Sequence, residues 1–93
     1  MGPAKNIARG VLELLATGEI IARLGGGIYK DGPSHCRASV SFLFEARKVY
    51  EAMYAKFPVM TEAFDYYESI CRDICVKNSL SLEEVLKEHA SSV

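Results

Sequence analysis

Apolar side chains recur at steps of three and four residues along most of the chain, a spacing typical of amphipathic α-helices. The longest such stretch is Ser34–Phe57, and it is bounded by Pro33 and Pro58, which limit where a helix begins and ends. Its apolar positions cover roughly 220° of a helical wheel, about twice the arc that a one-sided surface helix needs. We therefore expect this helix to be central, with neighbours on two sides.

A first helix is predicted over Lys5–Leu24. Its apolar stripe keeps its phase through Gly18, which favours one helix with a possible kink or break at that glycine. Because a glycine on a packing face also allows another helix to approach closely, we expect a neighbour there. Glycines and turn residues then separate this helix from the central one, for which Asp31 or Ser34 is the expected N-cap.

Two further helices follow the central one. The segment Glu62–Lys77 is the cleanest amphipathic pattern in the chain, with Thr61 as its expected N-cap and Asn78 as its stop. The last helix starts at Ser81 with the pattern Ser-Leu-Glu-Glu, a capping box, and is expected to end near His89.

These patterns predict an all-α fold, a compact bundle of four helices around a long central second helix. Residues 1–93 form a single helical domain, in which residues 1–4 are expected to be disordered or vector-derived and residues 90–93 frayed. The composition, 49% apolar and 25% charged, is that of a globular chain that can build one core.

The net charge of the chain bears on which kinds of molecule the protein could bind. A net charge of −1 creates no general field that would draw the protein to nucleic acid or to an anionic membrane. No apolar run approaches the length of a membrane span. Three cysteines are an odd number with no spacing typical of a secreted scaffold, so we expect a reducing, cytoplasmic location.

Two cysteines raise the possibility of metal binding. Cys71 and Cys75 are four residues apart on one helical face, and Cys36, His35 and His89 offer further ligands. A zinc-stabilised helical module is therefore a third candidate function. Since both cysteines lie on the apolar face, where a free cysteine behaves as a small hydrophobe, we expect core residues and no metal or cofactor.

Catalytic patterns are weak throughout the chain. His35 adjoins Cys36, but neighbouring side chains on a helix point about 100° apart, which does not let the imidazole activate the thiol. The glycine run before the central helix lacks the spacing of a phosphate-binding loop. We expect no catalytic residues and no enzyme.

A helix-turn-helix regulator that binds nucleic acid is the alternative function. The step Thr17-Gly18 is its candidate turn, which would make Glu19–Leu24 the recognition helix. That segment is mostly apolar with one arginine and would read bases poorly. We therefore regard nucleic acid as an improbable partner.

Protein binding is the function that the sequence favours. Five tyrosines and four phenylalanines are a large aromatic content for 93 residues, and tyrosine beside arginine is typical of binding hot spots. We predict a non-enzymatic interaction module, a small regulator or inhibitor of a larger partner. The candidate interaction residues all lie on the central helix: Phe42, Arg47, Val49, Tyr50, Met53 and Tyr54.

Two finer predictions concern this helix. Arg47 lies amid apolar positions, so we expect it to pair with a carboxylate of the third helix, Asp65 or Glu68, or to lie at an interface. The wide apolar arc predicts a homodimer with Val49 and Met53 near its two-fold axis. In the competing arrangement the first helix covers this edge and the protein is a monomer.

Overall fold

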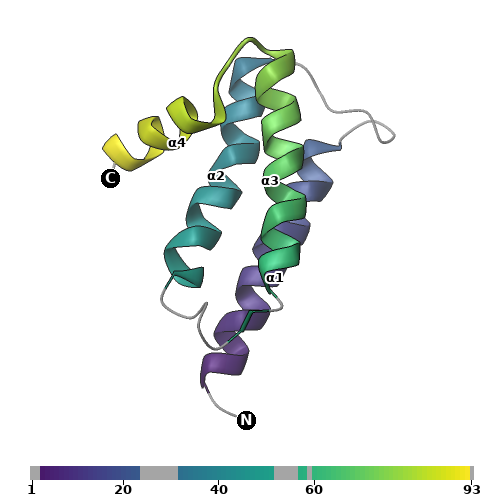
Figure 1. Ribbon diagram of the computed structural model, residues 1–93, viewed down its shortest axis with the longest axis vertical. Coiled ribbons are helices and arrows are strands. Elements are labelled where there is room, and N and C mark those ends of the chain that lie inside the picture. The colour runs from purple at the N-terminus through teal and green to yellow at the C-terminus, as the bar shows by residue number, and fades with distance from the viewer. Residues whose placement is uncertain (1–2, 24–31, 52–56, 59, 93) are drawn as a thin grey trace.

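The computed structural model describes residues 3–23, 32–51, 57–58 and 60–92. These residues form four helices, α1 (Pro3–Ala22), α2 (Pro33–Tyr50), α3 (Met60–Lys77) and α4 (Leu82–Ser91), and contain no strand. Helices α1 and α3 run in the same direction and α2 runs opposite to both, while the short α4 projects away from the other three at a steep angle (Figure 1). The predicted all-α bundle of four helices is confirmed.

Helix α2 occupies the centre, as its wide apolar arc predicted. It packs against α1, α3 and α4, whereas α1 and α4 do not touch each other within the described residues. The core draws on all four helices, with the largest share from α3. Its buried members are Ala8, Val11, Leu15, Ala22, Cys36, Val40, Leu43, Ala46, Met60, Phe64, Tyr67, Ile70, Cys71, Ile74, Cys75, Leu82 and Val85.

Helix α1 passes through Gly18 without a break, so the prediction of one helix is confirmed. A Cβ at Gly18 would lie 2.6 Å from Tyr67 Cζ and 2.9 Å from Phe42 Cβ, so only glycine lets three helices meet here. The turn at Thr17-Gly18, on which the helix-turn-helix alternative depended, is therefore absent. Helix α1 also starts at Pro3, earlier than predicted, and Leu24 lies outside the described residues.

Helix α2 is shorter than the predicted Ser34–Phe57. It ends at Tyr50 with Glu51 as C-cap. Phe57 is not helical, and its carbonyl accepts the Met60 amide at 3.0 Å in the turn that starts α3. Pro58 limits how far α2 can extend, but it does not determine where the helix ends. At the other end the N-cap is Gly32, whose φ of 128° favours glycine.

The predicted caps of α2 are not confirmed. Ser34 is wrong, because it lies inside the helix with Pro33 before it, and Asp31 lies outside the described residues. Thr61 as the N-cap of α3 is also wrong. Since α3 already begins at Met60, the Thr61 side chain is free to pair its hydroxyl with that of Tyr50 at 2.8 Å.

The turn between α3 and α4 follows its local sequence closely. Helix α3 ends at Lys77, and Asn78 follows it as predicted. Ser79 takes a φ of 57° and the Leu80 amide donates to the Cys75 carbonyl at 2.8 Å, the pattern of a Schellman turn. Ser81 is the N-cap of α4, and its hydroxyl accepts from the Glu84 amide, which confirms the predicted cap.

Helix α4 extends to Ser91, two residues beyond the predicted end at His89, and Ser92 is its C-cap. Its buried residues, Leu82 and Val85, lie in its first half. The second half of α4 therefore contributes no buried side chain to the core.

Candidate interaction surface

A groove of about 320 Å³ lies between the second half of α2 and the second half of α4. Residues spaced three and four apart on one face of each helix line it. From α2 and its C-cap these are Phe44, Arg47, Lys48 and Glu51, and from α4 they are Leu86, Lys87 and Ala90. We call this the α2–α4 groove.

The groove combines an apolar floor with a charged rim. Phe44, Leu86 and Ala90 supply the apolar surface. Leu86 packs against the core cluster from the edge of the groove. The charged lining residues are three cations and one carboxylate, Arg47, Lys48, Lys87 and Glu51. An apolar floor within a mainly cationic rim complements a ligand that carries apolar side chains beside acidic ones.

Polar contacts on the solvent side attach α4 to α2. Arg37 donates two hydrogen bonds to the carboxylate of Glu88, at 2.9 and 3.4 Å. His89 Nε2 lies 3.1 Å from the Arg37 carbonyl, and its ring stacks on that of Phe44 with centroids 5.8 Å apart. Because Arg37 is beside it, the pKa of the Glu88 carboxyl is lowered. These contacts set the position of α4 along one wall of the groove.

A chain of alternating charges joins three helices beneath the groove. Arg47 of α2 pairs with Glu68 of α3, which also forms an ion pair with Arg72 at 3.5 Å. Arg72 in turn binds Glu83 in the first turn of α4 at 2.9 Å and lowers the pKa of that carboxyl. The prediction that Arg47 would pair with Asp65 or Glu68 is confirmed for Glu68. The ion pair with Glu68 thereby fixes the Arg47 guanidinium in the rim of the groove.

The other two cations of the rim are held more loosely. Lys48 lies 3.7 Å from Glu45 and 5.5 Å from the centre of the Phe44 ring, over its face. Lys87 makes no hydrogen bond or ion pair within the described part of the chain. Its ammonium group is therefore available to a ligand carboxylate.

The structure brings together two of the predicted interaction residues, Arg47 and Tyr50, which line a hollow of about 250 Å³ between α2 and α3. Of the predicted residues that the structure describes, only Arg47 lines the α2–α4 groove. Phe42 faces Gly18 of α1, and Val49 packs against the core cluster. The Tyr50 ring lies against that of Phe64, with centroids 4.3 Å apart. The remaining two predicted residues, Met53 and Tyr54, lie outside the described residues.

Sequence reasoning missed most of the groove. Phe44, Leu86, Lys87 and Ala90 were not among the predicted interaction residues. One available signal was the spacing of Leu82, Val85, Leu86 and His89 on a helix too short to cover α2. The other was Phe44 one turn after Val40 on the same side of α2.

A smaller hollow of about 170 Å³ lies between α1 and α3, beside Leu12 and Tyr66. Large apolar side chains are exposed near it and elsewhere on these two helices: Ile7, Leu12, Ile20, Tyr66 and Val76. Its charged groups are already paired, because Glu19 accepts from Arg23 at 3.1 Å and from the Tyr66 hydroxyl at 2.9 Å. This hollow therefore offers no charge with which to select a ligand.

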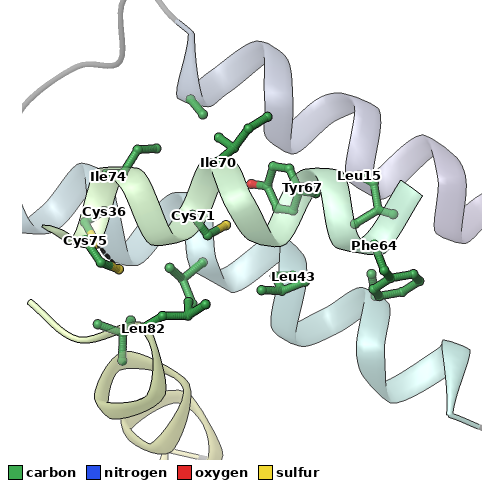
Figure 2. Packing of buried hydrophobic residues seen from close by; sticks show 14 of the residues in the cluster. Leu15, Cys36, Leu43, Phe64, Tyr67, Ile70, Cys71, Ile74, Cys75 and Leu82 are labelled. Carbon is green, nitrogen blue, oxygen red and sulfur yellow. Dashed lines mark hydrogen bonds between the residues drawn. The ribbon is translucent and has the colours of Figure 1, made fainter. Parts of the chain in front are cut away.

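The candidate metal ligands do not converge. Cys36 Sγ lies 2.9 Å from Cys75 Sγ, whereas Cys71 Sγ points to the Ser39 carbonyl at 3.7 Å (Figure 2). His89 lies in α4 beside Arg37. No group of three or more His, Cys, Asp or Glu residues that could hold a metal ion is found where the structure describes the chain.

Burial controls the chemistry of these thiols. It raises the pKa values of Cys71 and Cys75 to about 12 and also raises that of Cys36. The three groups are therefore protonated at neutral pH while they remain in the core.

Comparison of the chain with protein-family models, with curated proteins and with solved structures finds no match. None of the helices in the described ranges is long and apolar enough to cross a bilayer. The surface chemistry of the helices is thus the basis for a functional assignment.

Proposed function

We propose that this protein is a non-enzymatic interaction module whose α2–α4 groove binds an acidic, amphipathic segment of a partner protein. The observation that supports this function is the combination of an apolar floor, formed by Phe44, Leu86 and Ala90, with a rim of three cations and one carboxylate. Grooves of this kind accept an amphipathic helix that inserts one row of apolar side chains.

The unpaired cation favours an acidic partner over a neutral one. Lys87 has no partner within the described residues, so a carboxylate beside an apolar anchor would gain an ion pair without breaking an existing one. The arginine on the opposite wall, Arg47, is held by Glu68 and keeps its position when the groove is empty. A basic segment would instead place like charges together at a cost in affinity.

A matched pair of helical peptides tests this function. Both carry leucine at positions spaced three and four apart, and one has glutamate and the other lysine at the flanking positions. We expect the acidic peptide to bind and the basic one not to, with affinity falling as salt rises because rim charges are screened. Fluorescence anisotropy with a labelled peptide measures both effects.

Two charge reversals locate the binding site. Lys87→Glu changes the rim of the groove, whereas Arg9→Glu makes the same change on the exposed part of α1. We expect the first to weaken binding of the acidic peptide about tenfold and the second to leave it unchanged. Equal binding of both peptides, or equal effects of both substitutions, would contradict the proposal.

A role as a cytoplasmic regulator or inhibitor follows if the bound segment belongs to a larger protein whose function the module blocks. Self-association with Val49 and Met53 near the two-fold axis stays a prediction; Val49 already packs against the core cluster, and Met53 lies outside the described residues. Sedimentation velocity distinguishes a homodimer from a 10.3 kDa monomer. If the dimer forms through this edge, Val49→Glu dissociates it and leaves the helical content unchanged.

A further inference from the structure

Three cysteines gather where α2 begins and α3 ends, and all three are completely buried (Figure 2). Cys36 lies in the first turn of α2, and Cys75 lies in the last turn of α3. Cys71 is one turn earlier on α3. The sequence directed attention to Cys71 and Cys75, four residues apart, but the close pair is formed across two helices.

The two sulfurs of this pair are unusually close. Cys36 Sγ and Cys75 Sγ are 2.9 Å apart. Non-bonded carbon atoms, which are smaller than sulfur, settle at about 3.5–4.0 Å, and a disulfide bond measures about 2.05 Å. The sulfurs therefore approach more closely than apolar packing requires and need to move by less than an ångström to bond.

The Asn78 side chain connects these two helix ends. Asn78 accepts a hydrogen bond from the Gly32 amide at 2.7 Å and donates one to the Ile74 carbonyl at 2.9 Å. Gly32 is the N-cap of α2 and Asn78 directly follows α3, so this side chain bridges the two ends next to the cysteine pair. This bridge holds the start of α2 and the end of α3 side by side next to the two sulfurs.

We propose that Cys36 and Cys75 form an intramolecular disulfide that joins the start of α2 to the end of α3. The oxidant is a low-molecular-weight disulfide such as oxidised glutathione. One cysteine thiolate attacks a glutathione sulfur and releases one glutathione thiolate, which gives a mixed disulfide. The second cysteine thiolate then displaces the second glutathione. Both cysteines lose their protons, and the two electrons reduce one glutathione disulfide to two thiols.

Access to the sulfurs comes from opening of the helix ends. The raised pKa values keep the buried thiols protonated, and a thiolate is the attacking species, so exchange in the closed core is slow. Terminal helical turns open more readily than the centre of a bundle. We therefore expect the bond to form during folding, or more slowly from the native protein through local opening.

Refolding in a glutathione redox buffer tests the proposal directly. We expect the wild-type protein to lose two hydrogens in its intact mass, and a non-reducing digest to contain the Cys36 peptide joined to the Cys75 peptide. Oxidation should raise the melting temperature by about 10 °C or more, because the bond closes a long loop in the unfolded chain. Dithiothreitol should reverse both changes.

Matched variants identify the pair. Cys71→Ala removes a neighbouring buried thiol and leaves the pair intact, so it should oxidise as the wild type does. Cys36→Ala and Cys75→Ala should keep all their hydrogens, with circular dichroism used to establish that each is folded. A wild type that retains three free thiols after refolding in the oxidising buffer would overturn the proposal. So would a bond that contains Cys71 or a persistent mixed disulfide with glutathione.

Discussion

The side of α2 that faces α1 is packed more tightly than the side that faces α4. On the first side, Gly18 lets Tyr67 and Phe42 approach the α1 backbone, and the Tyr67 hydroxyl donates to the Ser39 carbonyl at 2.5 Å. On the second side, α4 is attached through Arg37 and leaves a groove of about 320 Å³.

Helix length and direction explain this difference. Helix α2 has 18 residues and α4 has 10, which correspond to lengths of about 27 and 15 Å. Helix α4 also projects away from α2 instead of running along it (Figure 1). The apolar positions of α2 that α4 does not reach therefore remain available. A wide apolar arc on a central helix indicates how much surface must be covered, but not which neighbour covers it.

The largest contrast is expected from truncating one leucine on each side. Leu43 is completely buried, so Leu43→Ala should lower the free energy of unfolding by about 2–5 kcal/mol. Leu86 is only partly buried at the groove, so Leu86→Ala should cost about 1 kcal/mol or less. Urea denaturation measures both. Equal losses would mean that the α4 side is as tightly packed as the α1 side.

A pair of glycine substitutions tests the close approach of the helices at Gly18. Gly18→Ala places a methyl group against Tyr67 and Phe42 and should destabilise the fold by about 1–3 kcal/mol. Gly10 is exposed in the same helix, with nothing within 4 Å of a Cβ, so Gly10→Ala should stabilise it by about 0.5–1 kcal/mol. Thermal unfolding of the two variants should therefore shift in opposite directions. A shift in the same direction would contradict the close approach at Gly18.

Local sequence patterns predicted those features that depend on neighbouring residues. The N-cap at Ser81 was foreseen, because it follows from residues within one helical turn. The pairing of Arg47 with Glu68 of another helix was one of the foreseen outcomes, because an isolated charge on an apolar face needs a partner. The continuity of α1 through Gly18 followed from the phase of its stripe.

Three other features, which depend on tertiary geometry or on where a helix ends, were not predicted. The groove requires the angle at which α4 leaves the bundle, and no periodicity encodes that angle. The contact between Cys36 and Cys75 joins residues far apart in the chain, whereas spacing directed attention to Cys71. The end of α2 at Tyr50 was also missed, because a proline only limits how far a helix can extend.

Acid should affect the α4 side selectively. The pKa values of Glu83 and Glu88 are lowered by Arg72 and Arg37, so these carboxylates stabilise the fold above their ordinary pKa of 4.5. That contribution is lost as the pH falls below this value and through the lowered pKa of the folded state. The effect should be small, because both carboxylates are exposed to solvent, which screens their ion pairs.

A double variant isolates this effect. Glu83→Gln combined with Glu88→Gln should melt below the wild type at about pH 6 and lose less stability on going to about pH 3. The control Glu13→Gln, on the exposed part of α1, should retain the wild-type pH dependence. If the double variant and the wild type lose the same stability on acidification, the ion pairs do not hold α4.

The most direct test of the central claim is to map the binding of the acidic helical peptide by amide chemical shifts of the ¹⁵N-labelled protein. We predict that the shifts concentrate at residues 44–51 of α2 and 86–90 of α4, and that Leu12, Ile20 and Tyr66 on the α1–α3 side stay unchanged. Shifts centred on the α1–α3 side, or none at saturating peptide, would contradict the assignment of the α2–α4 groove as the binding surface.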